Sequence, residues 1–374
     1  MAIEIRGEKS MFTDVTLKSF MRAWKIIFSL LTICGVNSVY GIEKPKGDYL
    51  ALFWNLENFI DTRFEPGEED GEFSSMGTRR WGWRRFAKKR DGIAKVLIDI
   101  GSRNGPSPGF PVLAGFAEVE NRYVLNQLIY ETPLAFAGYR IIHRDSPDRR
   151  GIDVALLYRK EYYKPIKNTY IDISKHISIQ MTSGFEKGKD SLRPERYTTR
   201  EILYSKGVLH DLDTIHLFVN HWPSKYGGEK ASAQYRVAAA DALISLCDSI
   251  LKENSKANLL IMGDFNDTPD SDVIMGFVER AGLVKPFIKR GEGTIKYEGG
   301  WEQIDMFIVS KNLMDKREPI SVSDDCFEIF DPGYLLERDR NYTGKRPKRT
   351  YLGPRYNGGL SDHLPVVLKI ERNW

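Results

Sequence analysis

The stretch ANLLIMGDFND, from Ala257 to Asp267, shows how this 374-residue chain is built. Its first part is a nearly continuous apolar run, which is typical of a strand covered on both faces of a sheet. Its second part places Asp264, Asn266 and Asp267 directly where that strand ends. Because α/β folds tend to build their sites at the carboxyl ends of strands, the stretch predicts a buried strand and a place for chemistry.

Six further segments carry a similar strand pattern, with β-branched, aromatic or apolar runs. They are residues 48–56, 110–119, 151–159, 213–222, 302–310 and 364–370. Helices are predicted over residues 83–101, which have apolar residues at helical spacing, and over the alanine-rich residues 229–254. Strands and helices alternate too often for an all-β protein, yet several strands follow one another between about residues 139 and 222. The pattern therefore favours an α/β protein with mixed sheets.

Composition is that of a globular protein, with 41% hydrophobic and 28% charged residues and no tract that predicts long disorder. The formal charge of +4 permits an anionic partner but does not require one. No linker long enough to separate two domains follows the N-terminal region, and no internal repeat is evident. Residues 311–360 are irregular and basic, and they predict a long loop region.

The first 41 residues have the features of a leader with a signal peptide. Arg22 and Lys25 precede an apolar core over residues 26–36, which is too short to span a bilayer comfortably, and small residues follow near Gly41. The polar residues before Met21 are unusual for a signal peptide, so Met21 is the expected true start. The pattern predicts export to the periplasm or the medium with no membrane span after cleavage. A short buried helix at the N-terminus is the alternative.

The chain has three cysteines, and Cys34 would leave with the leader. Cys247 and Cys326 are too few for a disulfide framework and are compatible with one bridge or none. Cys247 lies on the apolar stripe of the alanine-rich helix, so we interpret it as a small core residue.

Polar side chains gather at the ends of five predicted strands. The set comprises Asn55, Glu118, Glu120, Asn220, His221, Asp264, Asn266 and Asp267, with Asp305 inside a strand and Asp362 and His363 at the start of the last one. Each has an ordinary interpretation: Asn55 or Asp264 as a cap, Glu118 as a surface acid, His221 as a satisfied core histidine. Carboxylates, amides and imidazoles at so many strand ends call for a joint explanation, and a shared site provides one.

The order of the motifs resembles the endonuclease/exonuclease/phosphatase superfamily of metal-dependent phosphoesterases, which includes deoxyribonucleases, abasic-site endonucleases, neutral sphingomyelinases and inositol polyphosphate 5-phosphatases. The motifs are WNLENF, AEVEN, RGIDVALLY, NHWPS, GDFND, QIDMFIVS and GGLSDHLPV. The resemblance covers residues 48–371 as a single domain. It implies a four-layered α/β sandwich, in which two mixed β-sheets pack face to face with helices outside.

The resemblance also implies roles for individual residues. Glu118, Asn55 and Asp362 match the metal-binding positions, and His363 with its carboxylate partner Asp305 matches the catalytic histidine. Asp264 and Asn266 match the pair that positions the nucleophile and the phosphate. His221 is expected to act as a second acid or phosphate donor. Sequence leaves open whether Asp264 or His363 activates the water.

Elementary chemistry agrees with these assignments. Hydrolysis of a phosphate ester requires neutralisation of the phosphoryl charge and an activated water. A hard cation held by one or two carboxylates, Mg²⁺ with Mn²⁺ as a second possibility, supplies much of this chemistry. A histidine oriented by a carboxylate suits general acid–base work.

Two basic segments lie outside these motifs. RRWGWRRFAKKR, from Arg79 to Arg90, carries seven basic residues among aromatic ones, and GKRPKRTYLGPRY, from Gly344 to Tyr356, leads into the last motif. Basic residues interleaved with aromatic ones are able to follow a phosphate backbone and to stack on bases. The alternative for the first segment is a helix whose aromatic side chains point inward and whose charged side chains are solvated. Arg349 and Arg355, with Asn220, are the predicted substrate-binding residues.

The sequence thus predicts an exported, metal-dependent phosphodiesterase, most plausibly an endonuclease-like enzyme with nucleic acid as its partner; no protein partner is inferable. A phosphatase or phospholipase-C-type enzyme acting on inositol phosphates, phospholipids or other small esters is the alternative. A binding protein that has lost catalysis is a third reading, which the complete set of catalytic residues disfavours.

Overall fold

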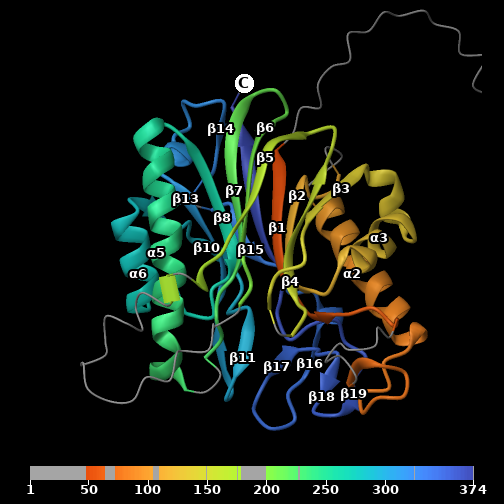
Figure 1. Cartoon of the computed structure of the whole chain (residues 1–374). Coiled ribbons are helices and arrows are strands. Elements are labelled where there is room, and N and C mark those ends of the chain that lie inside the picture. Colours follow the sequence, from red (N-terminus) through yellow and green to blue (C-terminus); the bar gives the residue numbers. More distant parts are fainter. Residues whose placement is uncertain are drawn as a thin grey trace, which may run out of the picture. The chain divides into compact units, whose positions relative to one another are not determined.

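The computed structural model describes residues 48–63, 72–103, 109–148, 150–174, 176–177, 199–225, 228–323 and 325–373. The predicted leader lies outside this part. Figure 1 shows two sheets side by side, with helices α2 and α3 on the outer face of one and helices α5 and α6 on the outer face of the other. The prediction of a four-layered α/β sandwich is confirmed.

The first sheet has eight strands in the order β10-β15-β20-β1-β2-β4-β3, with β14 paired to β20. Its strands are β1 (Tyr49–Phe59), β2 (Leu113–Val119), β3 (Tyr139–His143), β4 (Asp153–Arg159), β10 (Ile288–Arg290), β14 (Ile320–Ser321), β15 (Phe327–Ile329) and β20 (Val366–Arg372). Strands β1 and β2 are parallel, whereas β20 runs antiparallel to β1. The sheet is therefore mixed, as the sequence predicts.

The second sheet has six strands in the order β5-β6-β7-β8-β13-β9. They are β5 (Tyr163–Ile171), β6 (Ile202–Leu209), β7 (Asp213–His221), β8 (Asn258–Asp264), β9 (Leu283–Val284) and β13 (Asp305–Ser310). Strands β7 and β8 are parallel, and β13 runs antiparallel to β8. All seven residues of β8 are buried, as expected of a strand covered by the other sheet and by helices.

The helices cover the outer faces with their apolar stripes. They are α2 (Trp83–Arg103), α3 (Arg122–Tyr130), α5 (Glu229–Glu253) and α6 (Asp272–Arg280), and none of the described helices is long and apolar enough to cross a membrane. Cys247 in α5 and Cys326 before β15 are both buried and not bonded to each other, so this pair forms no bridge.

The expectation of one long loop over residues 311–360 is wrong. This region holds the short strands β14 and β15 and two hairpins, one of β16 (Leu336–Arg338) with β17 (Lys345–Pro347) and one of β18 (Tyr351–Leu352) with β19 (Arg355–Tyr356). A further hairpin, of β11 (Ile295–Tyr297) and β12 (Gly300–Glu302), lies just before it. Two short 3-10 helices, Asn312–Met314 and Gly333–Leu335, also lie in this region, and another, Pro133–Ala137, lies earlier in the chain. Strands of two or three residues are too short to show a period in sequence.

Candidate active site

The topology brings the polar strand ends to one edge of the sandwich, the lower edge in Figure 1. Asp264 at the end of β8 pairs with Asp305 at the start of antiparallel β13, and with His221 at the end of parallel β7. His363 precedes β20, whose start lies beside the end of antiparallel β1. The reversed direction of β13 and β20 explains why Asp305 and His363 stand at strand starts yet reach the same edge.

His363 and Asp305 form a buried hydrogen-bonded pair. The imidazole Nδ1 lies 2.7 Å from Oδ2 of Asp305, a carboxylate with no solvent exposure. Burial alone would lower the pKa of His363, but the carboxylates of Asp305 and Asp264 raise it well above the usual range. The imidazole is therefore held as a cation, with its Nε2 directed to within 3.8 Å of Asp264 Oδ2.

Asp264 lies at the centre of the cluster. Its Oδ2 accepts a hydrogen bond from Asn55 Nδ2 at 2.9 Å and its Oδ1 accepts one from the backbone N–H of Asn266 at 2.9 Å. Burial and the neighbouring Asp305 carboxylate raise the pKa of Asp264 to about 7. A carboxylate with a pKa near neutrality is suited to accept a proton from water.

His221 completes the cluster on the other side of Asp264, with Nε2 3.6 Å from its Oδ2. Burial, together with Arg200 and Arg150, lowers the pKa of His221 well below its usual range. The ring is therefore neutral, and its buried Nδ1 has no hydrogen-bond partner within the described residues. The two histidines thus carry different charges, because carboxylates outweigh burial at His363, whereas burial and two arginines act together at His221.

Local structure before β20 fixes the position of His363. The hydroxyl of Ser361 donates to the carbonyl of Asn55 at 2.6 Å and accepts from the N–H of His363 at 3.0 Å. The indole of Trp54 donates to the carbonyl of His363 at 2.9 Å. Gly359 allows close approach of two backbone segments, since a Cβ there would lie 1.7 Å from the carbonyl oxygen of Lys348. The segment is thus tied to β1 on both sides of the histidine.

The predicted metal ligands lie beside the cluster. Glu118 is on β2 next to Asn55 on β1, and its side chain is 12% exposed. Its Oε2 accepts from the N–H of Asn58 at 2.9 Å, and its Oε1 lies 3.5 Å from Arg150. Asp362 forms an ion pair of 2.7 Å with Arg349. Each carboxylate keeps free lone pairs, and carboxylate and amide oxygens are ligands that fit a hard divalent cation such as Mg²⁺.

A second potential ligand group overlaps the catalytic residues. Ligand atoms of Asp264, Asp305 and His363 all lie within 4.8 Å of one another. The hydrogen bond between His363 and Asp305 occupies two of these atoms, which favours a proton-transfer role for this pair. The acidic side at Glu118, Asn55 and Asp362 then remains the better place for a cation.

Sequence reasoning missed a buried charge network next to Glu118. The ammonium of Lys89, which is 1% exposed, donates to the carbonyl of Glu57 at 2.5 Å and to the hydroxyl of Thr350 at 2.7 Å. The carboxylate of Glu57 accepts from the N–H of Thr350 at 2.6 Å and from Arg349 Nε at 3.2 Å. Burial and the neighbouring Asp362 raise the pKa of Glu57 to about 7. Glu57 lies inside the WNLENF motif, so that motif carried a usable signal.

Arg150 and Arg200 were also missed. Arg150, whose side chain is 53% exposed, reaches Glu118 from the RGIDVALLY motif. Arg200 forms an ion pair of 3.1 Å with Asp148 and donates to the carbonyl of His221. Arg150 contacts Glu118 and Arg349 contacts Asp362, so each of these acidic ligands has a guanidinium group beside it.

The other two predicted substrate-binding residues are Asn220, which directly precedes His221 on β7, and Arg355. Asn220 has no exposure; its amide donates to the carbonyl of Met262 at 3.2 Å and its side-chain oxygen accepts from Trp222 at 3.2 Å. Arg355 is exposed on the hairpin of β18 and β19. Among the described contacts none joins either residue to the Asp264 cluster, and their roles stay predictions.

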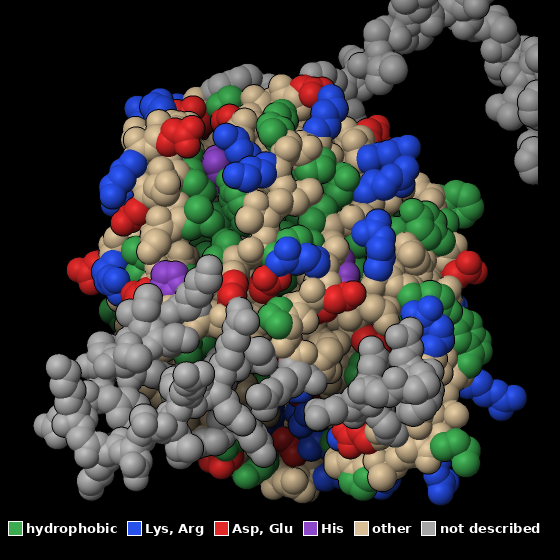
Figure 2. Space-filling view, viewed as in Figure 1, with side chains coloured by type: hydrophobic (Ala, Val, Ile, Leu, Met, Phe, Trp, Pro, Cys, Tyr) green, Lys and Arg blue, Asp and Glu red, His purple; other side chains and the backbone are tan. Residues whose placement is uncertain are grey.

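The segment Arg79 to Arg90 is largely used inside the fold. Trp81, Phe86 and Lys89 are buried, and Arg85 stacks on the ring of Tyr356 at 4.4 Å. The basic residues that stay exposed are Arg80, Arg84 and Lys88, beside the half-exposed Trp83. On the face shown in Figure 2, blue Lys and Arg side chains are interspersed with red Asp and Glu, so positive charge is spread over that face.

Comparison with known proteins identifies one matching family and several solved structures with a similar fold. The model of the "Endonuclease/Exonuclease/phosphatase family" matches residues 50–372. No protein in a curated set matches the sequence.

Solved structures with a similar fold have low sequence identity. An endonuclease/exonuclease/phosphatase family protein from Bacteroides thetaiotaomicron is 17% identical, with a TM-score of 0.50 over 87% of this chain and 98% of that one. A mannosyl-6-phosphatase from the same organism is 16% identical, with a TM-score of 0.50 over 86% and 99%. The human Nocturnin catalytic domain is 15% identical, with a TM-score of 0.50 over 88% and 96%. At such identities the likeness shows the fold.

Proposed function

Since the chain belongs to the endonuclease/exonuclease/phosphatase family and is a hydrolase of phosphate esters, we propose that it is a divalent-metal-dependent phosphodiesterase that cleaves nucleic acid. The observation that carries the proposal is the buried group of His363, Asp305, Asp264 and His221 beside the acidic side chains of Glu118 and Asp362. One cationic and one neutral histidine around a central carboxylate provide a proton acceptor and proton donors at a single place.

Asp264 is the general base in this proposal. Its pKa of about 7 leaves a large fraction ionised at neutral pH, and its Oδ1 is oriented by the N–H of Asn266. His363, held as a cation by Asp305, donates Nε2–H to a phosphate oxygen. His221 donates as a neutral ring from the other side. Of the two candidates for the general base, the proposal thus takes Asp264 rather than His363.

The predicted ligands Glu118, Asn55 and Asp362 would hold Mg²⁺ or Mn²⁺. A bound cation of this kind neutralises phosphoryl charge and stabilises the leaving oxygen. Arg349, which is 47% exposed and oriented by Asp362 and Glu57, adds positive charge for the substrate phosphate.

One observation favours a second function, hydrolysis of small phosphate monoesters. Arg150 and Arg349 are both about half exposed, and each contacts one acidic ligand, Glu118 and Asp362 respectively. Two guanidinium groups suit a terminal phosphate with two negative charges. A mannosyl-6-phosphatase has a similar fold, so sugar phosphates belong among the candidate substrates.

A substrate panel tests these proposals. The purified protein is assayed with Mg²⁺ or Mn²⁺ against plasmid DNA, bis(p-nitrophenyl) phosphate, mannose 6-phosphate, sphingomyelin and an inositol polyphosphate. Metal-dependent DNA cleavage that falls by about 10² to 10⁴ in His363→Ala is the expected result. Turnover that persists without a divalent metal, or no turnover on any substrate, would refute an enzyme of this kind. Cleavage of monoesters alone would select the second function.

We also propose export, supported by the sequence of the leader. Expression of the full chain in a bacterium with a Sec system should give a mature protein that begins after Gly41 and is found outside the cytoplasm. Mass spectrometry of the purified protein measures the cleavage point, and an uncleaved cytoplasmic product would contradict the proposal.

A further inference from the structure

Two hairpins extend from the edge that carries the catalytic residues. The hairpin of β11 and β12 begins at Thr294, whose hydroxyl accepts from the N–H of Asp305 at 3.3 Å. The carbonyl of Thr294 accepts from the N–H of Leu364 at 2.8 Å, one residue after His363. The base of this hairpin is thus bonded to the backbone on both sides of the catalytic pair.

The hairpin of β16 and β17 leads directly into the predicted phosphate-binding segment. Its second strand ends at Pro347, and the carbonyl of Lys348 then accepts from the N–H of Leu360 at 3.0 Å. Arg349 follows at once and reaches Asp362. This hairpin is therefore anchored beside Asp362 in the same site.

The two hairpins are fastened together. The ammonium of Lys296 on β11 donates to the carbonyls of Thr343 at 2.6 Å and Lys345 at 3.2 Å, and it lies 3.5 Å from Asp339. Lys296 and Asp339 have side chains that are each 4% exposed, so this link is buried. A Cβ at Gly299 would lie 2.8 Å from the ring of Tyr342, which places the tip of one hairpin against the other.

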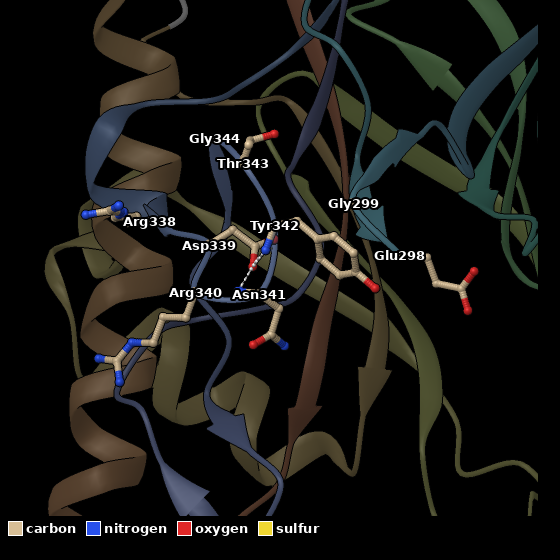
Figure 3. A pocket seen from close by; sticks show the side chains of 9 residues that line it. All are labelled: Glu298, Gly299, Arg338, Asp339, Arg340, Asn341, Tyr342, Thr343 and Gly344. Carbon is tan, nitrogen blue, oxygen red and sulfur yellow. Dashed lines mark hydrogen bonds between the residues drawn. The ribbon is translucent and has the colours of Figure 1, made fainter.

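A cavity of about 720 Å³ lies at this junction, lined by residues of both hairpins. Figure 3 shows the ring of Tyr342 extending toward the hairpin that carries Glu298, while Arg338 and Arg340 point to the other side. Tyr342 is 50% exposed, and Tyr297 next to Glu298 is 60% exposed. The ring of Tyr342 packs against Gly299, and the exposed parts of both tyrosines remain available to a ligand at the tips of the linked hairpins.

The charge of the hairpin tips is positive. Arg338, Arg340 and Lys345 are exposed, and Glu298 is the exposed acid among the residues that line the cavity. Asp339 is neutralised by Lys296. Exposed aromatic rings and exposed cations carried by the same pair of hairpins are the chemistry that binds single-stranded nucleic acid, because bases stack on rings and cations contact the phosphates.

The distance suits a substrate that also occupies the active site. Glu298 is four residues from Thr294, and a strand advances about 3.3 Å per residue, so the tip lies about 13 Å from the base of the hairpin. A polynucleotide with one phosphate at the catalytic residues therefore reaches the tips with a nearby nucleotide.

We propose that Tyr297 and Tyr342, with Arg338 and Arg340, form a platform that binds single-stranded nucleic acid a few nucleotides from the bond that is cleaved. This inference rests on the proposed nuclease function and adds to it a specificity-determining surface. The tyrosines stack on bases, and the arginines contact backbone phosphates.

The test compares a minimal substrate with a polymer. The double variant Tyr297→Ala/Tyr342→Ala is assayed with a short oligothymidine and with bis(p-nitrophenyl) phosphate, which is too small to reach the hairpin tips. KM for the oligothymidine should rise about tenfold or more, because stacking on each ring is lost. The kcat/KM for bis(p-nitrophenyl) phosphate should stay within about twofold. Tyr130→Ala, at a 55% exposed position on α3, is the matched control and should change neither value.

A binding measurement gives a second readout without turnover. Fluorescence anisotropy of a labelled oligothymidine, with the metal removed by EDTA, should show weaker binding by the double variant and a smaller salt dependence in Arg338→Ala/Arg340→Ala. Equal oligothymidine KM and binding in the double variant and the parent would overturn the platform, while the proposed nuclease function would stand. Cleavage of bis(p-nitrophenyl) phosphate without any cleavage or binding of oligothymidine would overturn the platform and the choice of nucleic acid together. Absence of all turnover on both substrates, with oligothymidine binding that depends on the tyrosines, would contradict the proposed function and leave the platform supported.

Discussion

Replacement of Asp305 by asparagine removes one negative charge from the centre of the site with little change in shape. Asp305 has no solvent exposure, and its Oδ2 lies 2.7 Å from Nδ1 of His363. Its carboxylate contributes to the raised pKa of His363 and to that of Asp264. The substitution therefore changes the proton affinities of both the proposed acid and the proposed base.

The sign is the same for both groups. Burial disfavours the cationic form of His363, so without the Asp305 charge its pKa falls, and the ring loses its proton at a lower pH. The pKa of Asp264 also falls from about 7, because a neighbouring like charge has gone. In Asp305→Asn both limbs of the pH–rate profile should move to lower pH. Near pH 8, kcat/KM should fall by about 10² to 10⁴, which corresponds to about 3–5 kcal/mol of transition-state stabilisation.

The measurement is kcat/KM for bis(p-nitrophenyl) phosphate from about pH 5 to 10 at saturating Mn²⁺. Asp213→Asn is the matched control, because Asp213 starts β7 at the opposite edge of the sheet and accepts from Asn258 at 2.8 Å. That variant should keep the parent profile, and thermal melts should show both variants folded. A folded Asp305→Asn protein with an unshifted profile and activity within about threefold of the parent would refute the assigned roles.

Three further changes test other parts of the structure. Gly359→Ala should destabilise the fold and lower activity, since its Cβ would lie 1.7 Å from the carbonyl oxygen of Lys348. Gly276→Ala in α6 is the matched control: its Cβ would meet no atom within 4 Å, so urea titrations should show a free energy of unfolding that is higher by about 0.5–1 kcal/mol. Burial lowers the pKa of His216 to about 4, so the unfolded chain binds a proton at this ring more tightly than the folded protein does. The free energy of unfolding should therefore fall by up to about 3 kcal/mol as pH drops from about 6.5 to 4. Urea unfolding at several pH values measures this decrease, which should be absent in His216→Gln. The two buried cysteines of the described region should react with a thiol reagent in denaturant but only slowly in the native protein, and a native protein lacking free thiols at these positions would contradict their unpaired state.

The sequence was sufficient to predict the strands that carry the site. Residues such as Leu259 to Met262 form long apolar runs whose burial dominates any local preference, so their strand assignment is secure. The order of the motifs then predicted which strand ends meet. The direction of β13 and β20 was beyond this reasoning, because pairing direction depends on contacts between segments distant in sequence.

Lys89 shows what sequence patterns cannot reveal. It lies in a run of basic residues, where a lysine is normally solvated, yet it is buried and bonded to Thr350, 261 positions away. Its partner Glu57 has a φ of 47° where β1 departs from regular pairing with β2. Neither the bulge nor the distant partner leaves a periodic trace, and this is also why the short hairpin strands were predicted as loop.

The charge balance of the active site explains why the irregular C-terminal region belongs to it. Burial lowers the pKa of Lys89 to about 8, while Glu57, Glu118 and Asp362 all act to raise it, so one ammonium serves three carboxylates. Buried carboxylates without countercharge would be costly, and a single lysine leaves them undercompensated. Arg349 supplies part of the missing charge from a segment outside both sheets. Arg150 does the same at Glu118, but Arg150 and Arg349 are 53% and 47% exposed, so solvent screens these two countercharges. Glu118 and Asp362 therefore stay suited to bind a divalent cation.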